Sequence, residues 1–99
     1  MLNINKNKVG NELTVTLDGR LDTTTAPTLE SELKAALGGI ESLIFDMTSL
    51  QYISSAGLRV LLSAQKIMNR QGNMIVRNAS EDVKEIFDVT GFSDILTIE

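Results

Sequence analysis

The sequence predicts an α/β fold in which a mixed sheet of four to five strands carries helices mainly on one face. Segments typical of strands alternate with segments whose apolar residues recur at helical spacing. The order strand–strand–helix–strand–helix–strand–helix–strand favours parallel neighbours joined by right-handed crossovers. The 99 residues fit one domain and are too few for helices to cover both faces. We therefore predict a single domain over residues 1–99.

The N-terminal segment predicts two strands joined by a tight turn. Apolar and polar residues alternate over residues 13–17, and this period of two is typical of a strand with one buried face. The preceding residues predict an edge strand with Leu2 and Ile4 on one face, and Gly10–Asn11 suits the hairpin turn. The expected buried side chains of the second strand are Leu13, Val15 and Leu17.

A first helix is predicted from about residue 25 to the glycine pair Gly38–Gly39, which ends it. Thr25 suits the N-cap, and Pro27 lies near the helix start, where proline is tolerated. Glu30 and Glu32 are expected in the early turns, where the helix dipole favours acidic residues. The apolar residues on one helical face are Leu29, Leu33, Ala36 and Leu37.

The middle of the chain predicts a strand, a helix and another strand. Leu43–Asp46 is a short apolar run ended by a carboxylate, as in a central buried strand. Residues 48–54 predict a short connection to a helix that begins near residue 56 and ends near Gly72. Residues 73–79 predict the next strand.

The C-terminal segment predicts a third helix and a short final element. Ser80 is expected to cap this helix and Gly91 to end it. Its buried face is expected to consist of Val83, Ile86 and Phe87. Residues 93–99 predict a last short strand or a terminal extension that packs Ile95, Leu96 and Ile98.

The composition excludes several classes of function. The chain has no cysteine, which removes disulfides and thiolate chemistry, and no histidine, which removes Ser-His-Asp catalysis and histidine-ligated zinc. A net charge of −4 without a dense basic run argues against nucleic-acid binding. No window approaches about 18 consecutive apolar residues, and no signal peptide is evident. We expect a cytoplasmic protein without a cofactor, a metal or a membrane segment.

The segment Ser54–Gly57 lies at the predicted start of the second helix and has four interpretations. Ser54 could simply be an N-cap, since serine is favoured there. A phosphate-binding loop fits poorly, because the segment has one glycine and no Gly-Lys-Ser/Thr follows. A nucleophile elbow fails for lack of G-x-S-x-G and of any histidine base. A serine that is itself phosphorylated remains, because a phosphate at a helix N-terminus is stabilised by free backbone N–H groups.

Charged residues near this segment suggest an interaction surface. A polar stripe on the second helix is either an ordinary solvated face or, with Arg59 one turn from Ser55, the border of a partner site. Asp22 lies in the connection before the first helix. It could cap that helix, remain a surface charge, or help to position a serine hydroxyl or a kinase-bound nucleotide. The stripe consists of Arg59, Ser63, Lys66 and Arg70.

Three segments together resemble the STAS domain, in the stand-alone bacterial form that acts as an anti-sigma factor antagonist. They are LDGRLDTTTAPTLESEL, SLIFDMTSLQYISSAGLRVLLSAQK and VRNASEDVKEIFDVTGFSDIL, and they cover nearly the whole chain in order. The most specific part is DMTSLQYISSAGL, which matches the strand–loop–helix signature of the family.

The resemblance implies a regulatory binding module and not an enzyme. In this family the unphosphorylated antagonist binds an anti-sigma factor, often a serine kinase, and so frees a sigma factor; a serine phosphatase reverses the phosphorylation. The family pattern Asp-Ser-Ser/Thr-Gly-Leu places the modified serine at Ser55 and leaves Ser54 where the acid is usual. The implied partner-facing patch consists of Asp22, Thr24, Ser54, Ser55, Ala56, Gly57 and Arg59. We expect the chain alone to be a monomer.

Two alternatives remain at this point. The chain could be a STAS docking subunit of a larger signalling assembly or transporter ATPase, without a phosphorylation switch. An enzyme with Ser55 as nucleophile and Lys66 as base is disfavoured, because 11 residues of helix separate the two by about 16 Å.

Overall fold

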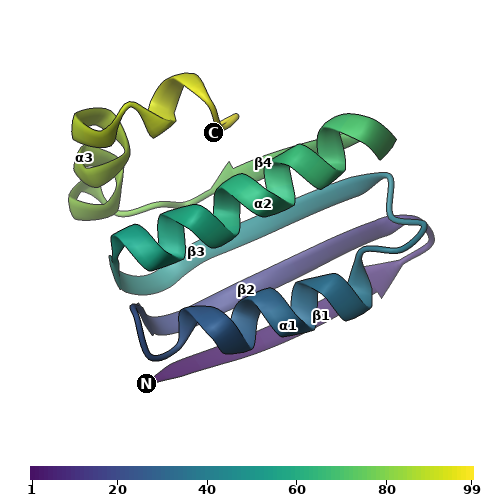
Figure 1. Cartoon of the computed structure of the whole chain (residues 1–99), viewed down its shortest axis with the longest axis horizontal. Coiled ribbons are helices and arrows are strands. Elements are labelled where there is room, and N and C mark those ends of the chain that lie inside the picture. The colour runs from purple at the N-terminus through teal and green to yellow at the C-terminus, as the bar shows by residue number, and fades with distance from the viewer.

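The computed structural model describes residues 1–99 and contains four strands, three α-helices and one 3₁₀ turn (Figure 1). The predicted order of elements is confirmed up to the third helix. The elements are β1 (Leu2–Val9), β2 (Glu12–Leu21), α1 (Ala26–Ala36), β3 (Ser42–Ile53), α2 (Ser55–Gln71), β4 (Asn73–Arg77), α3 (Glu81–Thr90) and the 3₁₀ turn η1 (Phe92–Asp94).

The four strands form one mixed sheet in the order β1-β2-β3-β4. β1 is antiparallel to β2, whereas β2–β3 and β3–β4 are parallel. Val9 pairs with Glu12 across a two-residue turn, in which Gly10 has a φ of 60°. Glycine adopts this left-handed conformation without steric cost, so the predicted hairpin is confirmed.

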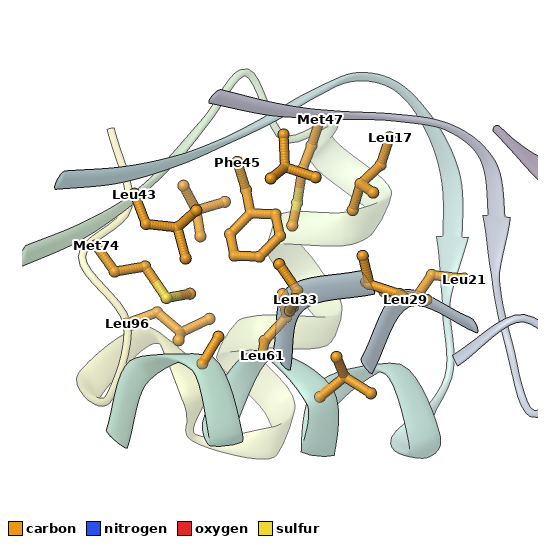
Figure 2. Packing of buried hydrophobic residues seen from close by; sticks show 14 of the residues in the cluster. Leu17, Leu21, Leu29, Leu33, Leu43, Phe45, Met47, Leu61, Met74 and Leu96 are labelled. Atoms are coloured by element: carbon orange, nitrogen blue, oxygen red, sulfur yellow. The ribbon is translucent and has the colours of Figure 1, made fainter. Parts of the chain in front are cut away.

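The helices cover one face of the sheet, as predicted. α1 and α2 lie side by side across it, and α3 packs toward the β3–β4 side (Figure 1). Figure 2 shows Leu43, Phe45 and Met47 of β3 in the same cluster as Leu33 of α1 and Leu61 of α2. This single core contains 25 buried residues and includes side chains from all three helices, which accounts for a stable domain without disulfides. No helix is both long and apolar enough to span a bilayer.

β3 is longer than predicted, and the prediction of a connection at residues 48–54 is wrong for all but the last residue. β3 runs to Ile53, which pairs with Leu21 of β2. The register between the two strands shifts twice, after Thr16 and after Gly19. These irregularities break the alternation of apolar and polar residues, so the period-of-two pattern that identifies a strand is lost there. The buried residues of this part of β3 are Met47, Leu50 and Ile53.

The two glutamates of α1 lie beyond its first turn, so the expectation that they serve the helix dipole is wrong. Each is instead close to a lysine. Glu32 Oε1 lies 3.0 Å from Lys6 Nζ of β1, and Glu30 Oε1 lies 3.8 Å from Lys34 Nζ one helical turn later. The first pair links α1 to the edge strand, while the second is an exposed pair of small energetic weight.

α3 begins and ends as predicted. The Ser80 hydroxyl accepts a hydrogen bond from the Val83 N–H at 3.2 Å, and Gly91 has a φ of 81° directly after the last turn. Val83 and Phe87 are buried, whereas Ile86 is half-buried against the core.

The C-terminus is an extension and not a full strand. Residues 97–99 run beside β4 with one bridge, Val76 to Ile98. Leu96 is buried and Ile98 packs against the core, as predicted, but Ile95 is 46% exposed. Burial alternates through the extension, with Ile95 and Thr97 exposed and Leu96 and Ile98 turned toward the core, so the adjacent residues Ile95 and Leu96 cannot both be buried.

Candidate functional site

The start of α2 holds its two serines in different environments. The Ser54 N–H donates to the Leu21 carbonyl at 2.9 Å, and the Ser54 hydroxyl accepts from the Gly57 N–H at 3.3 Å. Ser54 is therefore a half-buried N-cap, as the simplest interpretation predicted. Ser55 is the first residue of α2 and is exposed. The N–H groups of Ser55 and Ala56 have no acceptor within the helix.

Gly57 lies beneath the surface and allows α2 to approach the sheet closely. It is buried, and a Cβ atom added there would lie 2.7 Å from Leu21 Cγ and 2.9 Å from Ile53 Cγ1. Both distances are shorter than real Cβ contacts, so no larger side chain fits without movement of the neighbours. Of the predicted patch residues, Gly57 thus positions the others and offers no contact surface of its own.

Asp22 closes the turn between β2 and α1. Its Oδ1 accepts hydrogen bonds from the Thr24 hydroxyl at 2.7 Å and from the Thr24 N–H at 3.0 Å. Thr25 is the N-cap residue of α1, as predicted, although its side chain makes no capping hydrogen bond. Its hydroxyl instead donates to the Arg20 carbonyl at 2.9 Å and accepts from the Asp22 N–H at 2.9 Å. The threonines are thus used to shape the turn that leads into α1.

The hydrogen bond from the Thr24 hydroxyl is the main cause that lowers the pKa of Asp22 below its usual 3.8; partial burial acts in the opposite direction. Hydrogen bonds to the carboxylate stabilise the charged form. These hydrogen bonds therefore stabilise the turn at pH values above the ordinary pKa of aspartate. The stabilisation is lost as the pH falls through the lowered pKa of Asp22.

An acid titration followed by NMR tests this turn. We expect the Thr24 amide resonance to titrate with a midpoint below 3.8, and the Thr24→Val variant to move the Asp22 midpoint upward. The Asp22→Asn variant, which has no carboxyl group there, should abolish the transition. A midpoint that is the same in Thr24→Val and in the wild type would contradict the assigned cause.

A groove lies between the starts of α1 and α2, beside Ser55. Its volume is about 280 Å³, and its lining brings together residues about 30 positions apart in the sequence. Two of the predicted patch residues, Ala56 and Arg59, line it directly, and Asp22 and Thr24 belong to the turn at its border. The residues that line the groove are Thr23, Ala26, Pro27, Glu30, Ala56, Arg59 and Val60.

Arg59 forms no ion pair within the chain, although Glu30 lines the same groove. Glu30 is instead close to Lys34 on its own helix. The lining of the groove therefore combines small apolar residues, a guanidinium on α2 that forms no ion pair, and a carboxylate on α1. This combination suits recognition of a polar protein segment.

Sequence reasoning missed the contribution of α1 to this site. The sequence predicted Pro27 and Glu30 only as parts of the first helix and assigned no role to Thr23, and no local pattern connects these residues with Ala56. The contact follows from the parallel pairing of β2 with β3, which brings the two strand ends and the helices after them together. A second missed contact lies nearby, where the Arg20 guanidinium stands 4.5 Å from the centre of the Tyr52 ring.

Asp46 does not belong to the candidate site. It lies within β3 and not at its end, seven residues before Ile53. Its carboxylate accepts hydrogen bonds from the Thr48 hydroxyl at 2.7 Å and from Asn78 at 3.3 Å. The Thr48 hydroxyl is the main cause that lowers the pKa of Asp46. These contacts give Asp46 a structural role between β3 and the connection after β4.

Comparison with known proteins gives the family. The STAS domain model matches residues 3–99. The chain belongs to the STAS domain family. BtrV of Bordetella bronchiseptica is 33% identical over 99 residues, which cover 98% of this chain and 85% of BtrV. The anti-sigma-B factor antagonist of Bacillus subtilis is 29% identical over 98% of this chain and 90% of its own length.

Solved structures of low sequence identity share the fold of this STAS domain. An anti-sigma factor antagonist from Mycobacterium paratuberculosis matches with a TM-score of 0.89 at 18% identity, over 99% of this chain and 85% of that one. The anti-sigma factor antagonist SpoIIAA in its unphosphorylated form matches with a TM-score of 0.78 at 18% identity, over 98% of this chain and 87% of SpoIIAA. At such identities the likeness concerns the fold alone.

Proposed function

We propose that this STAS domain is an anti-sigma factor antagonist whose binding is switched off by phosphorylation of Ser55. The proposal rests chiefly on one observation: Ser55 exposes its hydroxyl at the first position of α2, beside a groove, while the Ser54 hydroxyl is engaged as the cap. Relatives that bear the name anti-sigma factor antagonist cover nearly the whole chain, which supports the same function.

The geometry favours Ser55 over Ser54 as the phosphate acceptor. In phosphoryl transfer the serine hydroxyl oxygen must approach the γ-phosphorus of ATP in line with the leaving ADP oxygen, so the hydroxyl must be accessible to the kinase. Ser54 is half-buried, and loss of its cap would cost helix stability of about 1 kcal/mol. Ser55 has neither restriction, and a phosphate there lies at the positive end of the α2 dipole, so the fold can accept it.

The proposed partner is an anti-sigma factor of the serine kinase type. It would contact the turn at Asp22 and Thr24, the cap residue Ser54, and the surface formed by Ser55, Ala56 and Arg59. Gly57 supports this surface from below. The chain itself carries out no catalysis in this proposal: Ser55 is a substrate of the kinase, and a serine phosphatase would restore the binding-competent form.

Phosphate transfer to single-serine variants tests the assignment. The chain is incubated with ATP and the kinase-type anti-sigma factor encoded in the same genome, and the products are measured by intact mass spectrometry. We expect the wild type and Ser54→Ala to gain one phosphate, and Ser55→Ala to gain none. Thermal unfolding shows whether each variant is still folded. We expect only Ser54→Ala to unfold at a lower temperature than the wild type, because only this variant removes the helix cap.

Other outcomes point elsewhere. Phosphate transfer to Ser55→Ala but not to Ser54→Ala would make Ser54 the acceptor. No transfer to any form, together with recovery of a transporter ATPase in a pull-down, would favour a docking subunit without a phosphorylation switch.

A further inference from the structure

We infer that Arg59 is an intramolecular counter-ion for the phosphate on Ser55, an inference that rests on the proposed phosphorylation. Ser55 and Arg59 are four residues apart on α2 and are both exposed. Side chains with this spacing are neighbours on one helical face, and their Cβ atoms are about 5–6 Å apart. A guanidinium can therefore reach phosphate oxygens on Ser55 without a change in the backbone.

Arg59 is available for this contact. Three lysines and Arg77 lie within 4.0 Å of a carboxylate, and Arg20 lies over the ring of Tyr52. Arg59 has neither kind of partner. Guanidinium groups match phosphate oxygens with two parallel N–H donors, and such charge-assisted bonds are roughly twice as strong as neutral ones.

The start of α2 has no anion of its own. α2 has no acidic residue in its first turn, where the positive end of the dipole lies, and Arg59 follows one turn after Ser55. A dianionic phosphate on Ser55 would neutralise both the helix terminus and Arg59. Phosphorylation should therefore be tolerated by the fold and should at the same time order the Arg59 side chain.

The pairing also changes the groove. In the unmodified chain the groove has one free cation, Arg59, and one acid, Glu30, which lies near Lys34. Once Arg59 turns toward the phosphate, the same surface carries a net negative charge. Phosphorylation would then do two things to a partner: add an anion at Ser55 and withdraw the guanidinium from the groove.

The second ionisation of the phosphate reports this contact without any partner. The second pKa of phosphoserine is about 6, and a cation that binds the dianion lowers this pKa. The charged residues on the elements that meet at the start of α2 are Arg59 on α2, Glu30 on α1, Asp22 in the turn before α1, and Arg20 of β2, which lies over the Tyr52 ring. Hydrogen bonds from Thr24 lower the pKa of Asp22, so its carboxylate is already ionised where the phosphate titrates.

The test uses the full chain with phosphoserine introduced at position 55 during translation, followed by ³¹P NMR titration between pH 4 and 8. We expect Arg59→Gln to raise the phosphate pKa by about 0.5 unit, which is a roughly threefold change in the ionisation constant. Arg59→Lys should give an intermediate value, because lysine keeps the charge but loses the bidentate geometry.

Arg70→Gln is the matched control, since Arg70 is exposed in the last turn of the same helix, about 22 Å away. The phosphate pKa measured in Arg70→Gln should equal that of the wild type, because this distance exceeds the screening length at 0.1 M salt. Equal pKa values in Arg59→Gln and the wild type would overturn the inference, as would equal shifts in both glutamine variants. Because the phosphate is installed without a kinase, these results are independent of whether Ser55 is the natural acceptor.

Discussion

Replacement of Gly57 by valine is expected to lower the free energy of unfolding by about 2–3 kcal/mol, the upper part of the range for overpacked cores. The position is buried where α2 meets the ends of β2 and β3. The first added carbon alone would lie 2.7 Å from Leu21 Cγ and 2.9 Å from Ile53 Cγ1. Leu21 and Ile53 are themselves fully packed in the core, so neither can move aside without opening space elsewhere.

Alanine at the same position should cost less than valine. Its single methyl group meets the same neighbours, but alanine is favoured over glycine inside a helix by about 1 kcal/mol, and this gain offsets part of the clash. The order glycine, alanine, valine in decreasing stability therefore tests steric contact and not helix propensity, which would put alanine first.

Urea unfolding followed by circular dichroism measures the effect, and Gly38→Ala is the control. Gly38 has open space around the position of a Cβ atom, so its replacement should change stability by no more than about 0.5 kcal/mol. An unchanged midpoint for Gly57→Val would show that α2 does not depend on this close approach. We also expect the variant to shift the amide resonances of Ser54–Arg59, since the helix start must move away from Leu21.

Most of the fold could be predicted because its signals are local. The period-of-two pattern of β2, the glycines that end α1 and α3, and the Ser80 cap each act within a few residues. The prediction ended β3 too early, because the irregular register of β3 with β2 spaces its buried residues by three. A spacing of three belongs to neither a regular strand nor a simple turn, so only the pairing itself reveals the strand.

The site was predictable only in part, for a related reason. The two serines follow one another in sequence. The Ser54 cap is a local hydrogen bond from the Gly57 N–H, whereas the backbone bond that holds Ser54 to β2 joins it to Leu21, more than 30 residues earlier. The groove likewise joins α1 to α2 through the parallel strands beneath them. No sequence pattern around Pro27 or Glu30 indicates that these residues line a groove with α2. The family resemblance pointed to Ser55 but not to its neighbours.

Phosphate on Ser55 is expected to lower the affinity for the anti-sigma factor partner by at least about 100-fold, or about 2.8 kcal/mol. Ser55 belongs to the proposed contact surface and directly precedes Ala56, which lines the groove. A phosphate adds nearly two negative charges, and burial of such a group against a surface without a matching cation costs several kcal/mol. Pairing with Arg59 reduces this penalty only by removing a cation from the same surface.

Isothermal titration calorimetry of the chain with phosphoserine installed at position 55 measures this loss. Phosphoserine at position 80 is the matched control: Ser80 is an exposed cap of another helix, so the net charge changes equally at a remote place. That form should bind within about threefold of the unmodified chain, as should Ser55→Ala. If both phosphorylated forms lose affinity equally, the effect is one of total charge, and a switch confined to the start of α2 is wrong.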